Sequence, residues 1–258
     1  MKSKHGQATI FVIVAVTIVV LILLFFLLKS YIVPPTTTSS ASETPNQYIS
    51  ECITENIDEA AKLIIQNNGY ISKSDYNESM EYEYAEIPYF CHTSDYYERC
   101  VAQEPVIISH LNEEIYNYLE DKIEECFDSF KSDLESDGYT LLSVGQTSFE
   151  VELMPGKVHV EVLKDIKFKK AEETKEFRKF VVSSVSPLYN MATIVQRIIK
   201  EESLWTNSGY VEIMRVNDWV DINKFTTGNV NEIYTVIDKK TGSSWRFAVK
   251  GGVLPVPK

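Results

Sequence analysis

The fold is set by residues 106–138, VIISHLNEEIYNYLEDKIEECFDSFKSDLESDG, in which apolar side chains recur every three or four positions. Such spacing places the apolar side chains along one face of an α-helix, while acidic side chains crowd the opposite face. Pro105 stands just before the pattern, and Asp137-Gly138 predicts its end. We therefore expect a long amphipathic helix whose apolar face needs a partner.

A second stretch with the same spacing lies upstream at residues 45–69, PNQYISECITENIDEAAKLIIQNNG. Thr44 suits a helix N-cap with Pro45 at the first helical position, and Asn68-Gly69 predicts the C-terminal stop. Because both helices carry an apolar stripe, we expect them to pack against each other.

After residue 138 the spacing of apolar residues changes from helical to alternating. Residues 149–153 and 158–162 alternate around Pro155-Gly156, which predicts a β-hairpin with one buried face. Residues 177–185 predict a third strand, Ser186-Pro187 the start of a third helix, and residues 232–238 and 243–250 a second hairpin. Helices first and strands later are typical of an α+β fold.

Residues 8–28 contain no charged side chain, and at 1.5 Å per residue they would extend about 30 Å, the thickness of a bilayer core. The run is too long for a cleaved secretory leader and lacks its small-residue cleavage site. Lys2 and Lys4 precede it and only Lys29 follows closely, which favours a cytoplasmic N-terminus. We expect a single-pass cell-membrane protein with a transmembrane signal anchor at residues 1–29 and an extracytoplasmic C-terminal domain.

The segment Lys4 to Phe11, KHGQATIF, resembles the class III signal peptides of archaeal pilins and archaellins. That resemblance implies processing between Gly6 and Gln7. Assembly-competent members carry Glu at the fifth mature position, where this chain has Phe11, so the resemblance favours an anchor over a filament helix. The whole chain also resembles uncharacterised single-pass archaeal surface proteins, through YISEC at residues 48–52 and GYI at residues 69–71.

Residues 30–45 are rich in Pro, Ser and Thr and predict a linker, either an O-glycosylated stalk or an ordinary flexible connection. The ectodomain would then cover residues 46–258, with a helical, disulfide-linked part at 46–137 and a β-rich part at 138–258. Residues 1–29 hold three Lys and no acid, which leaves 22 basic and 37 acidic side chains and a net charge of −15 on the remainder. Such a domain repels nucleic acid.

Four cysteines, all in the proposed external part, predict disulfides. Four cysteines allow three connectivities, and we favour Cys52–Cys126, which joins the two helices, with Cys91–Cys100, which closes CHTSDYYERC. The alternative is a zinc site built from these cysteines and His92. Structural zinc sites usually present a closely spaced cysteine pair, which this sequence lacks.

No catalytic motif is present, and the four histidines are scattered along the chain. The tyrosine-rich connection at residues 70–105 is more suggestive, because such loops give rigid contact area at low entropic cost. We expect partner binding by Tyr84, Tyr89, Tyr96 and Tyr97, unless these side chains cover the core beneath the loop. Asn77-Glu78-Ser79 is a glycosylation acceptor pattern at Asn77.

Taken together, these patterns predict a membrane-anchored extracytoplasmic protein without enzymatic activity, acting in envelope structure, adhesion or partner binding. A pilin-like filament subunit and an anchored envelope hydrolase are the alternatives. The expected partners are the lipid bilayer, through residues 8–28, and a protein or glycan outside the cell, with a homo-oligomer left open. We expect no cofactor, no metal and no nucleic acid.

Overall fold

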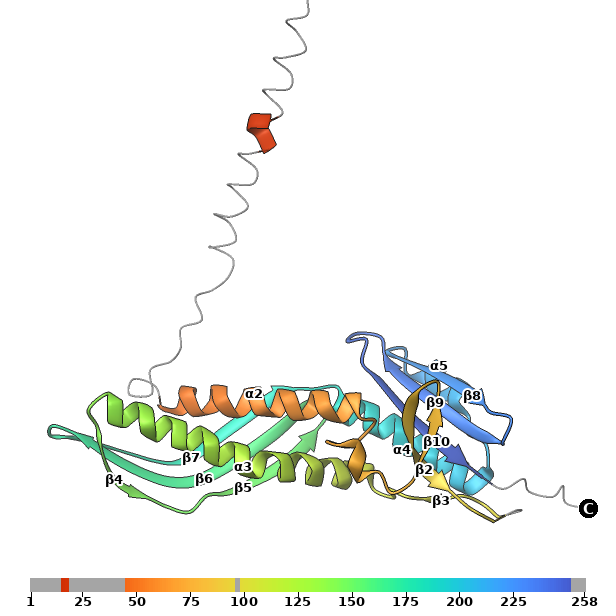
Figure 1. Ribbon diagram of the computed structural model, residues 1–258, viewed down its shortest axis with the longest axis horizontal. Helices are drawn as coiled ribbons and strands as arrows, with labels where there is room; N and C mark the ends of the chain where they lie inside the picture. Colours follow the sequence, from red (N-terminus) through yellow and green to blue (C-terminus); the bar gives the residue numbers. More distant parts are fainter. Residues whose placement is uncertain (1–14, 19–44, 96–97, 252–258) are drawn as a thin grey trace, which may run out of the picture. The chain divides into compact units, whose positions relative to one another are not determined.

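The computed structural model describes residues 15–18, 45–95 and 98–251. Residues 1–39 and 40–258 form separate units, and the fold described below is that of the second. Its described residues form an α+β fold with two sheets (Figure 1).

The transmembrane element of the expected fold class is wrong, and so is the single-pass location. Among residues 15–18, 45–95 and 98–251, no helix is long and apolar enough to cross a membrane. The two long helices of this part are amphipathic. Each has a charged face that suits water and an apolar face that suits a protein core. Of the predicted span at residues 8–28, only residues 15–18 are described; Gly6, Gln7 and residues 30–44 also lie outside the described residues.

Helices α2 (Pro45–Gln66) and α3 (Ile107–Ser136) pack against each other in antiparallel orientation. A disulfide joins Cys52, near the start of α2, to Cys126, near the end of α3, with a Cα–Cα distance of 5.9 Å. At the opposite ends, the backbone N–H of Ile71 donates to Glu114 Oε2 over 2.6 Å. The predicted C-terminal stop of α2 also holds, since Asn68 and Gly69 both have positive φ.

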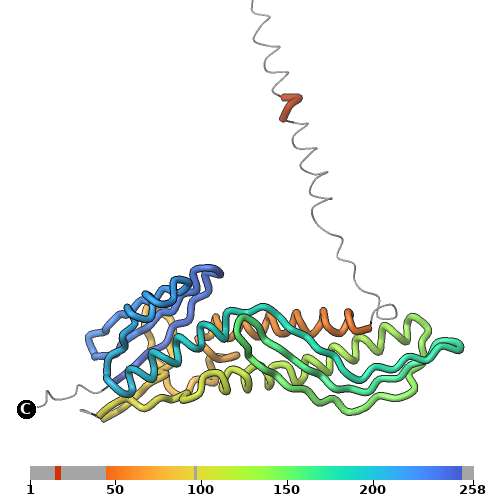
Figure 2. Tube along the Cα trace, turned by 180° about the vertical axis from the view of Figure 1, so that it is seen from behind, coloured from red at the N-terminus to blue at the C-terminus, as the bar shows by residue number. Residues whose placement is uncertain are grey.

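The first sheet, called here the helix-covered sheet, consists of β4 (Thr140–Val144), β5 (Ser148–Met154), β6 (Lys157–Lys170) and β7 (Glu173–Val185). All pairs are antiparallel. Strand β7 pairs with β6 along most of its length, so β4 and β5 share the other edge of β6, one after the other. Helices α2 and α3 cover one face of this sheet, as Figures 1 and 2 show from opposite sides.

The second sheet, called here the composite sheet, has the order β1-β2-β10-β9-β8, with the short β3 also paired to β2. Its strands are β1 (Ser79–Tyr82), β2 (Ala85–His92), β3 (Val101–Ala102), β8 (Val220–Thr226), β9 (Asn231–Asp238) and β10 (Ser244–Lys250). Strands β2 and β10 run parallel, and the other pairs are antiparallel. The composite sheet therefore combines two segments that lie far apart in the sequence.

Three further helical elements complete the described fold: η1 (Lys73–Asp75), α4 (Leu188–Trp205) and α5 (Tyr210–Val216). Helix α4 contacts both sheets as well as α3. Its Gln196 accepts the N–H of Ile107 over 2.8 Å and donates to the carbonyl of Pro105 over 2.9 Å. The first N–H of α3 thus gains a partner that its own N-cap residue, Val106, does not provide.

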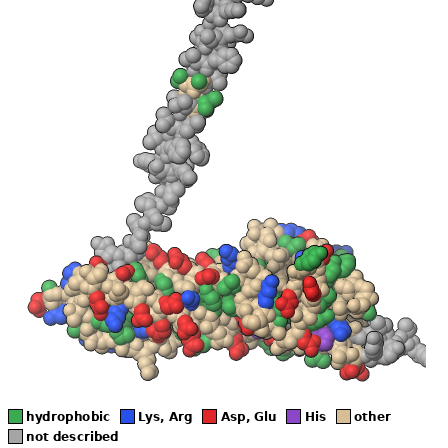
Figure 3. All heavy atoms as spheres, viewed as in Figure 1, with side chains coloured by type: hydrophobic (Ala, Val, Ile, Leu, Met, Phe, Trp, Pro, Cys, Tyr) green, Lys and Arg blue, Asp and Glu red, His purple; other side chains and the backbone are tan. Residues whose placement is uncertain are grey.

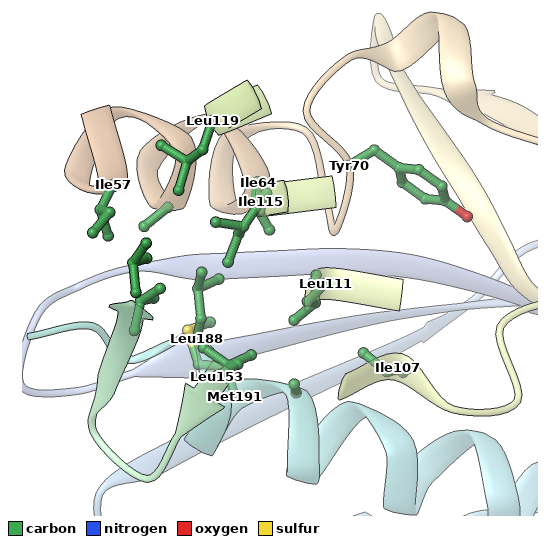
Figure 4. Close-up of a cluster of buried hydrophobic side chains, with 14 of the residues drawn as sticks. Ile57, Ile64, Tyr70, Ile107, Leu111, Ile115, Leu119, Leu153, Leu188 and Met191 are labelled. Carbon is green, nitrogen blue, oxygen red and sulfur yellow. The ribbon is translucent and has the colours of Figure 1, made fainter. Parts of the chain in front are cut away.

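One hydrophobic core extends from the helices through both sheets. Figure 4 shows its centre, where Ile57 and Ile64 of α2 and Leu111, Ile115 and Leu119 of α3 lie near Leu153, Leu188 and Met191. At the junction with the composite sheet, Gly69 leaves no room for a side chain, because an added Cβ would lie 2.6 Å from Trp245 Cζ2 and 2.9 Å from Phe90 Cζ. This close approach fixes the end of α2 against the composite sheet.

The tyrosine-rich segment differs from the loop that we expected. Much of it forms β1, β2 and β3, and the residues from Ile87 to Cys91 are all buried. Five consecutive buried residues show neither helical nor alternating spacing, and Pro88 within the run is atypical of a strand. The strand is stabilised by its long-range partner β10 rather than by a local pattern.

Candidate partner-binding groove

A groove with a volume of about 660 Å³ lies between α2 and the C-terminal end of β7. Its α2 wall is formed by residues that recur at helical spacing, namely Asp58, Ala61, Lys62, Ile65 and Gln66. Its other wall is the serine-rich stretch from Ser183 to Pro187, and Ser243 also lines the groove. The volume falls within the range of about 300–1,000 Å³ that is typical of ligand sites.

The groove lies at the edge of β7 rather than over one face of the sheet. The hydroxyl of Ser184 donates to Asp58 Oδ1 on the helix-covered face. The hydroxyl of the preceding residue, Ser183, contacts His159 Nδ1 at 2.9 Å on the opposite face. Because neighbouring side chains of a strand point to opposite faces, a groove lined by both residues must border the strand edge.

The walls of this groove offer mixed chemistry. Val185 is 90% exposed, and Ile65 adds apolar surface, whereas Lys62 and Gln66 are polar and exposed. Among the described residues, no ion pair of Lys62 is found. The groove therefore combines apolar surface with groups of both charges, since Asp58 lines it as well as Lys62.

A row of three residues beside the groove has the composition of a hydrolase triad. Glu152, His159 and Ser183 lie opposite one another on β5, β6 and β7. Only the His159–Ser183 contact is formed; in the described part of the chain no contact joins His159 to Glu152, which would orient the imidazole in a triad. The row lies on the exposed face of the sheet, without a surrounding pocket that would exclude water.

The comparisons with known proteins add no second source of inference. The chain matches no protein-family model, no curated protein and no solved structure.

The structure contains two disulfides, Cys52–Cys126 and Cys91–Cys100, which confirms the prediction of disulfide bonds. These are the pairs that the sequence favoured. With all four cysteines bonded, none is left to bind zinc. His92 instead contacts Glu78, with 2.7 Å between Nδ1 and Oε2.

The four tyrosines of the predicted recognition face have different environments. Tyr84 is fully exposed at the β1–β2 turn, where its φ is +62°. Tyr89 is buried and packs in a small cluster with Ile87, Ile233 and Ala248 on the face of the composite sheet that carries Met80 and Tyr82. Tyr96 and Tyr97 lie outside the described residues. Asn77 is exposed just before β1, and its glycosylation stays a prediction.

The acidic face of α3 is only partly a solvated surface. Figure 3 shows acidic side chains spread over α2 and α3, yet two of the α3 carboxylates have specific structural partners. Glu114 accepts the Ile71 N–H, and burial raises its pKa despite that hydrogen bond. Glu124 accepts from Lys164 Nζ over 2.6 Å.

Lys164 is a buried charge that the sequence did not reveal. Its side chain is 6% exposed and lies on the helix-covered face of β6, where Nζ also donates to Thr147 Oγ1 over 2.6 Å. Burial acts to raise the pKa of Glu124, but its hydrogen bonds with Lys164 and Thr147 outweigh burial and hold that pKa below the ordinary value. The only sequence signal is a lysine at an inward position of an alternating strand.

A second buried charged cluster supports the composite sheet. Glu202 of α4 is 2% exposed and accepts hydrogen bonds from the Tyr234 hydroxyl and, over 2.8 Å, from the Ser208 N–H. Lys224 lies 2.8 Å from Glu232 and 3.5 Å from Glu202. Among the described residues, no group of His, Cys, Asp and Glu could hold a metal ion. We assign this cluster to holding α4 and the α4–α5 loop against β8 and β9.

Proposed function

We propose that this protein is a non-enzymatic binding protein that engages a macromolecular partner in the groove between α2 and β7. The observation that carries the proposal is the groove itself, which combines about 660 Å³ of volume with exposed apolar and polar walls at an open sheet edge. The two disulfides support action in an oxidising compartment, because such bonds persist there.

Partner binding fits the groove better than hydrolysis does. Catalysis would require a positioned nucleophile, a base and a group that orients the base, enclosed away from water. Ser183 and His159 supply one contact of that kind on an exposed face. A binding site requires only complementary surface and polar groups that can bind a ligand. Val185 provides exposed apolar surface, and Lys62 provides a charge that has no ion pair in the described part of the chain.

Two matched tryptophan substitutions on α2 test the proposal. Gln66→Trp would fill the groove, whereas Glu55→Trp places the same bulk on an exposed position about 16 Å further along the helix, outside the groove. We expect oxidised Gln66→Trp protein to lose saturable binding to an extract of the source cells in biolayer interferometry. Glu55→Trp should bind like the wild type. Equal binding by all three proteins would contradict a partner site in the groove.

A further inference from the structure

Strand β7 is an edge strand whose two halves differ in charge. In the described part of the chain it pairs with β6 alone. Residues 173–179, ETKEFRK, carry five charged side chains, whereas residues 180–185, FVVSSV, carry none. Charged side chains protect edge strands against pairing with other chains, and an uncharged β-branched edge lacks this protection. The unprotected half is the half that borders the groove.

One contact at the end of β7 determines which of its residues hydrogen-bond to β6 and which face the free edge. The N–H of Ser186 donates to the carbonyl of Gly156 over 3.0 Å, and Lys157 lies opposite Val185. In an antiparallel pair, residues alternate between bonding the neighbouring strand and pointing away from it. Ser184 and Val182 therefore bond β6, while Val181, Ser183 and Val185 direct their N–H and C=O groups to the free edge.

These outward groups form a regular template. Alternate residues of a strand are about 6.6–6.8 Å apart, so Val181, Ser183 and Val185 present three donor–acceptor pairs that match the backbone of an added strand. Residues Ala61 and Ile65 of α2 lie along the same groove and provide apolar surface for side chains. A sugar or a helix would leave the repeating backbone groups unmatched.

We propose that the groove binds an extended peptide segment of a partner protein by strand addition to the free edge of β7, which rests on the proposed function. The added strand pairs with residues 181–185 and lies beside α2. Asp58 also lines the groove, but its carboxylate already accepts a hydrogen bond from the Ser184 hydroxyl. Lys62 has no ion pair within the described residues, so it favours a peptide with a carboxylate where the chain passes α2. The partner is recognised mainly through its backbone, and one acidic side chain opposite Lys62 increases the affinity.

The test uses oxidised full-length protein and a displayed library of random seven-residue peptides as the probe. Selected peptides are resynthesised with single backbone N-methyl groups and measured by fluorescence polarisation. Strand addition predicts that N-methylation at alternate positions weakens binding by about tenfold or more, while the intervening positions tolerate it. Hydrogen exchange should slow at Val181, Ser183 and Val185 upon peptide binding, whereas Val182 and Ser184 are protected already.

The matched variants are Val185→Pro and Val185→Thr. Proline removes the outward N–H of an edge position and leaves the β6 ladder in place, while threonine keeps both the N–H and the β-branched shape. We expect Val185→Pro to weaken peptide binding about tenfold and Val185→Thr to leave it within about twofold. Lys62→Glu should weaken the binding of acidic peptides and strengthen the binding of analogues in which the acidic residue is replaced by Lys. The N-methyl and exchange measurements on wild-type protein remain decisive if Val185→Pro does not fold.

Three outcomes would overturn the proposed peptide complex. Peptide binding that is blocked by Gln66→Trp but insensitive to N-methylation and to Val185→Pro would leave the groove function standing and refute the strand geometry. Protection of the same amides by self-association alone would identify a second copy of the chain as the occupant. Binding of purified glycans without selection of any peptide would assign the groove to sugars.

Discussion

The two sheets are assembled from the chain in different ways. The helix-covered sheet uses one continuous segment from Thr140 to Val185. Strand β6 pairs with both of its sequence neighbours, β5 and β7, across short connections, and β4 pairs with β6 beyond the intervening β5. The composite sheet depends on the parallel pairing of β2 with β10, in which Tyr89 lies opposite Ala248, 159 positions later. Local pairing needs little loop closure, whereas long-range pairing must offset a larger loss of chain entropy.

This difference shows which interactions each sheet depends on. The helix-covered sheet derives its order from alternating apolar residues and the disulfide-linked helix pair above it. The composite sheet depends on a few close contacts at its junction with α2, chiefly those of Gly69 with Phe90 and Trp245. The sequence has three tryptophans: Trp205 at the end of α4, Trp219 just before β8, and Trp245 in β10. Tryptophan fluorescence therefore reports on the composite sheet and the segment that leads into it.

The largest effect is expected on removing the disulfide that joins α2 to α3. The bond closes a loop with a sequence separation of 74, which includes β1, β2 and β3. The double variant Cys52→Ala/Cys126→Ala should lower the free energy of unfolding by about 4 kcal/mol. Because the loop includes strands of the composite sheet, far-UV circular dichroism and tryptophan fluorescence should both shift in denaturant unfolding. A loss below about 1 kcal/mol would show that helix packing alone holds the pair.

A smaller effect, restricted to the junction, is expected for Gly69→Ala. The new Cβ would clash with Trp245 and Phe90, and the φ of +105° is unfavourable for alanine. We expect a loss of about 3 kcal/mol, with the tryptophan transition affected first. Gly138→Ala is the matched control, since its φ is +82° but its added Cβ has no neighbour within 4 Å. That variant should lose only about 1 kcal/mol, and equal losses would indicate that backbone strain, not the contact, decides.

The second disulfide should matter mainly to the composite sheet. Cys91–Cys100 closes a short loop between β2 and β3 with a sequence separation of 9. Cys91→Ala/Cys100→Ala should cost about 2.5 kcal/mol, and the tryptophan signal should respond more than the helical signal. A shift of the same size in both signals would mean that the two sheets unfold as one cooperative unit.

The smallest expected effect lies in the helix-covered sheet at Lys164. Lys164→Met keeps the apolar stem but removes the partner of Glu124, which is half exposed and can be rehydrated. We expect a loss of about 1 kcal/mol at pH 7.

The same variant makes a prediction about pH. The pKa of Glu124 in the folded wild type lies below the ordinary value of 4.5, so its stabilising contribution is present above that value and is lost as the pH falls through the folded pKa. Wild-type stability should therefore fall more steeply than that of Lys164→Met between about pH 5 and pH 3. Parallel curves would show that the pair contributes no stability.

Local patterns predicted much of this fold. The bounds of α2 and α3, the β5–β6 hairpin and the β9–β10 hairpin follow from helical or alternating spacing and from Gly-containing turns. Strand β2 was missed because its buried run has no alternation and contains Pro88, and its partner β10 is distant in sequence. The transmembrane element was inferred from an apolar run at residues 8–28, and no described helix supports it.

The candidate groove was invisible in the sequence for a similar reason. Asp58 and Ser184 lie 126 positions apart, and neither belongs to a recognisable motif. The uncharged stretch FVVSSV was recognised as a strand, but the sequence could not show that one edge of this strand stays unpaired. The number of tyrosines in residues 70–105 suggests a recognition surface, yet Tyr89 packs in a small buried cluster.

The parallel pairing of β2 with β10 has a consequence for biosynthesis. During translation β2 emerges before its partner, because Tyr89 precedes Ala248 by 159 residues. At about 5–20 residues per second, β2 must wait on the order of 10 s before β10 has been made. Both cysteines of the β2–β3 loop emerge at the start of that interval. We expect the Cys91–Cys100 ring to close on the nascent chain and to hold β2 beside β3 until the last strand arrives.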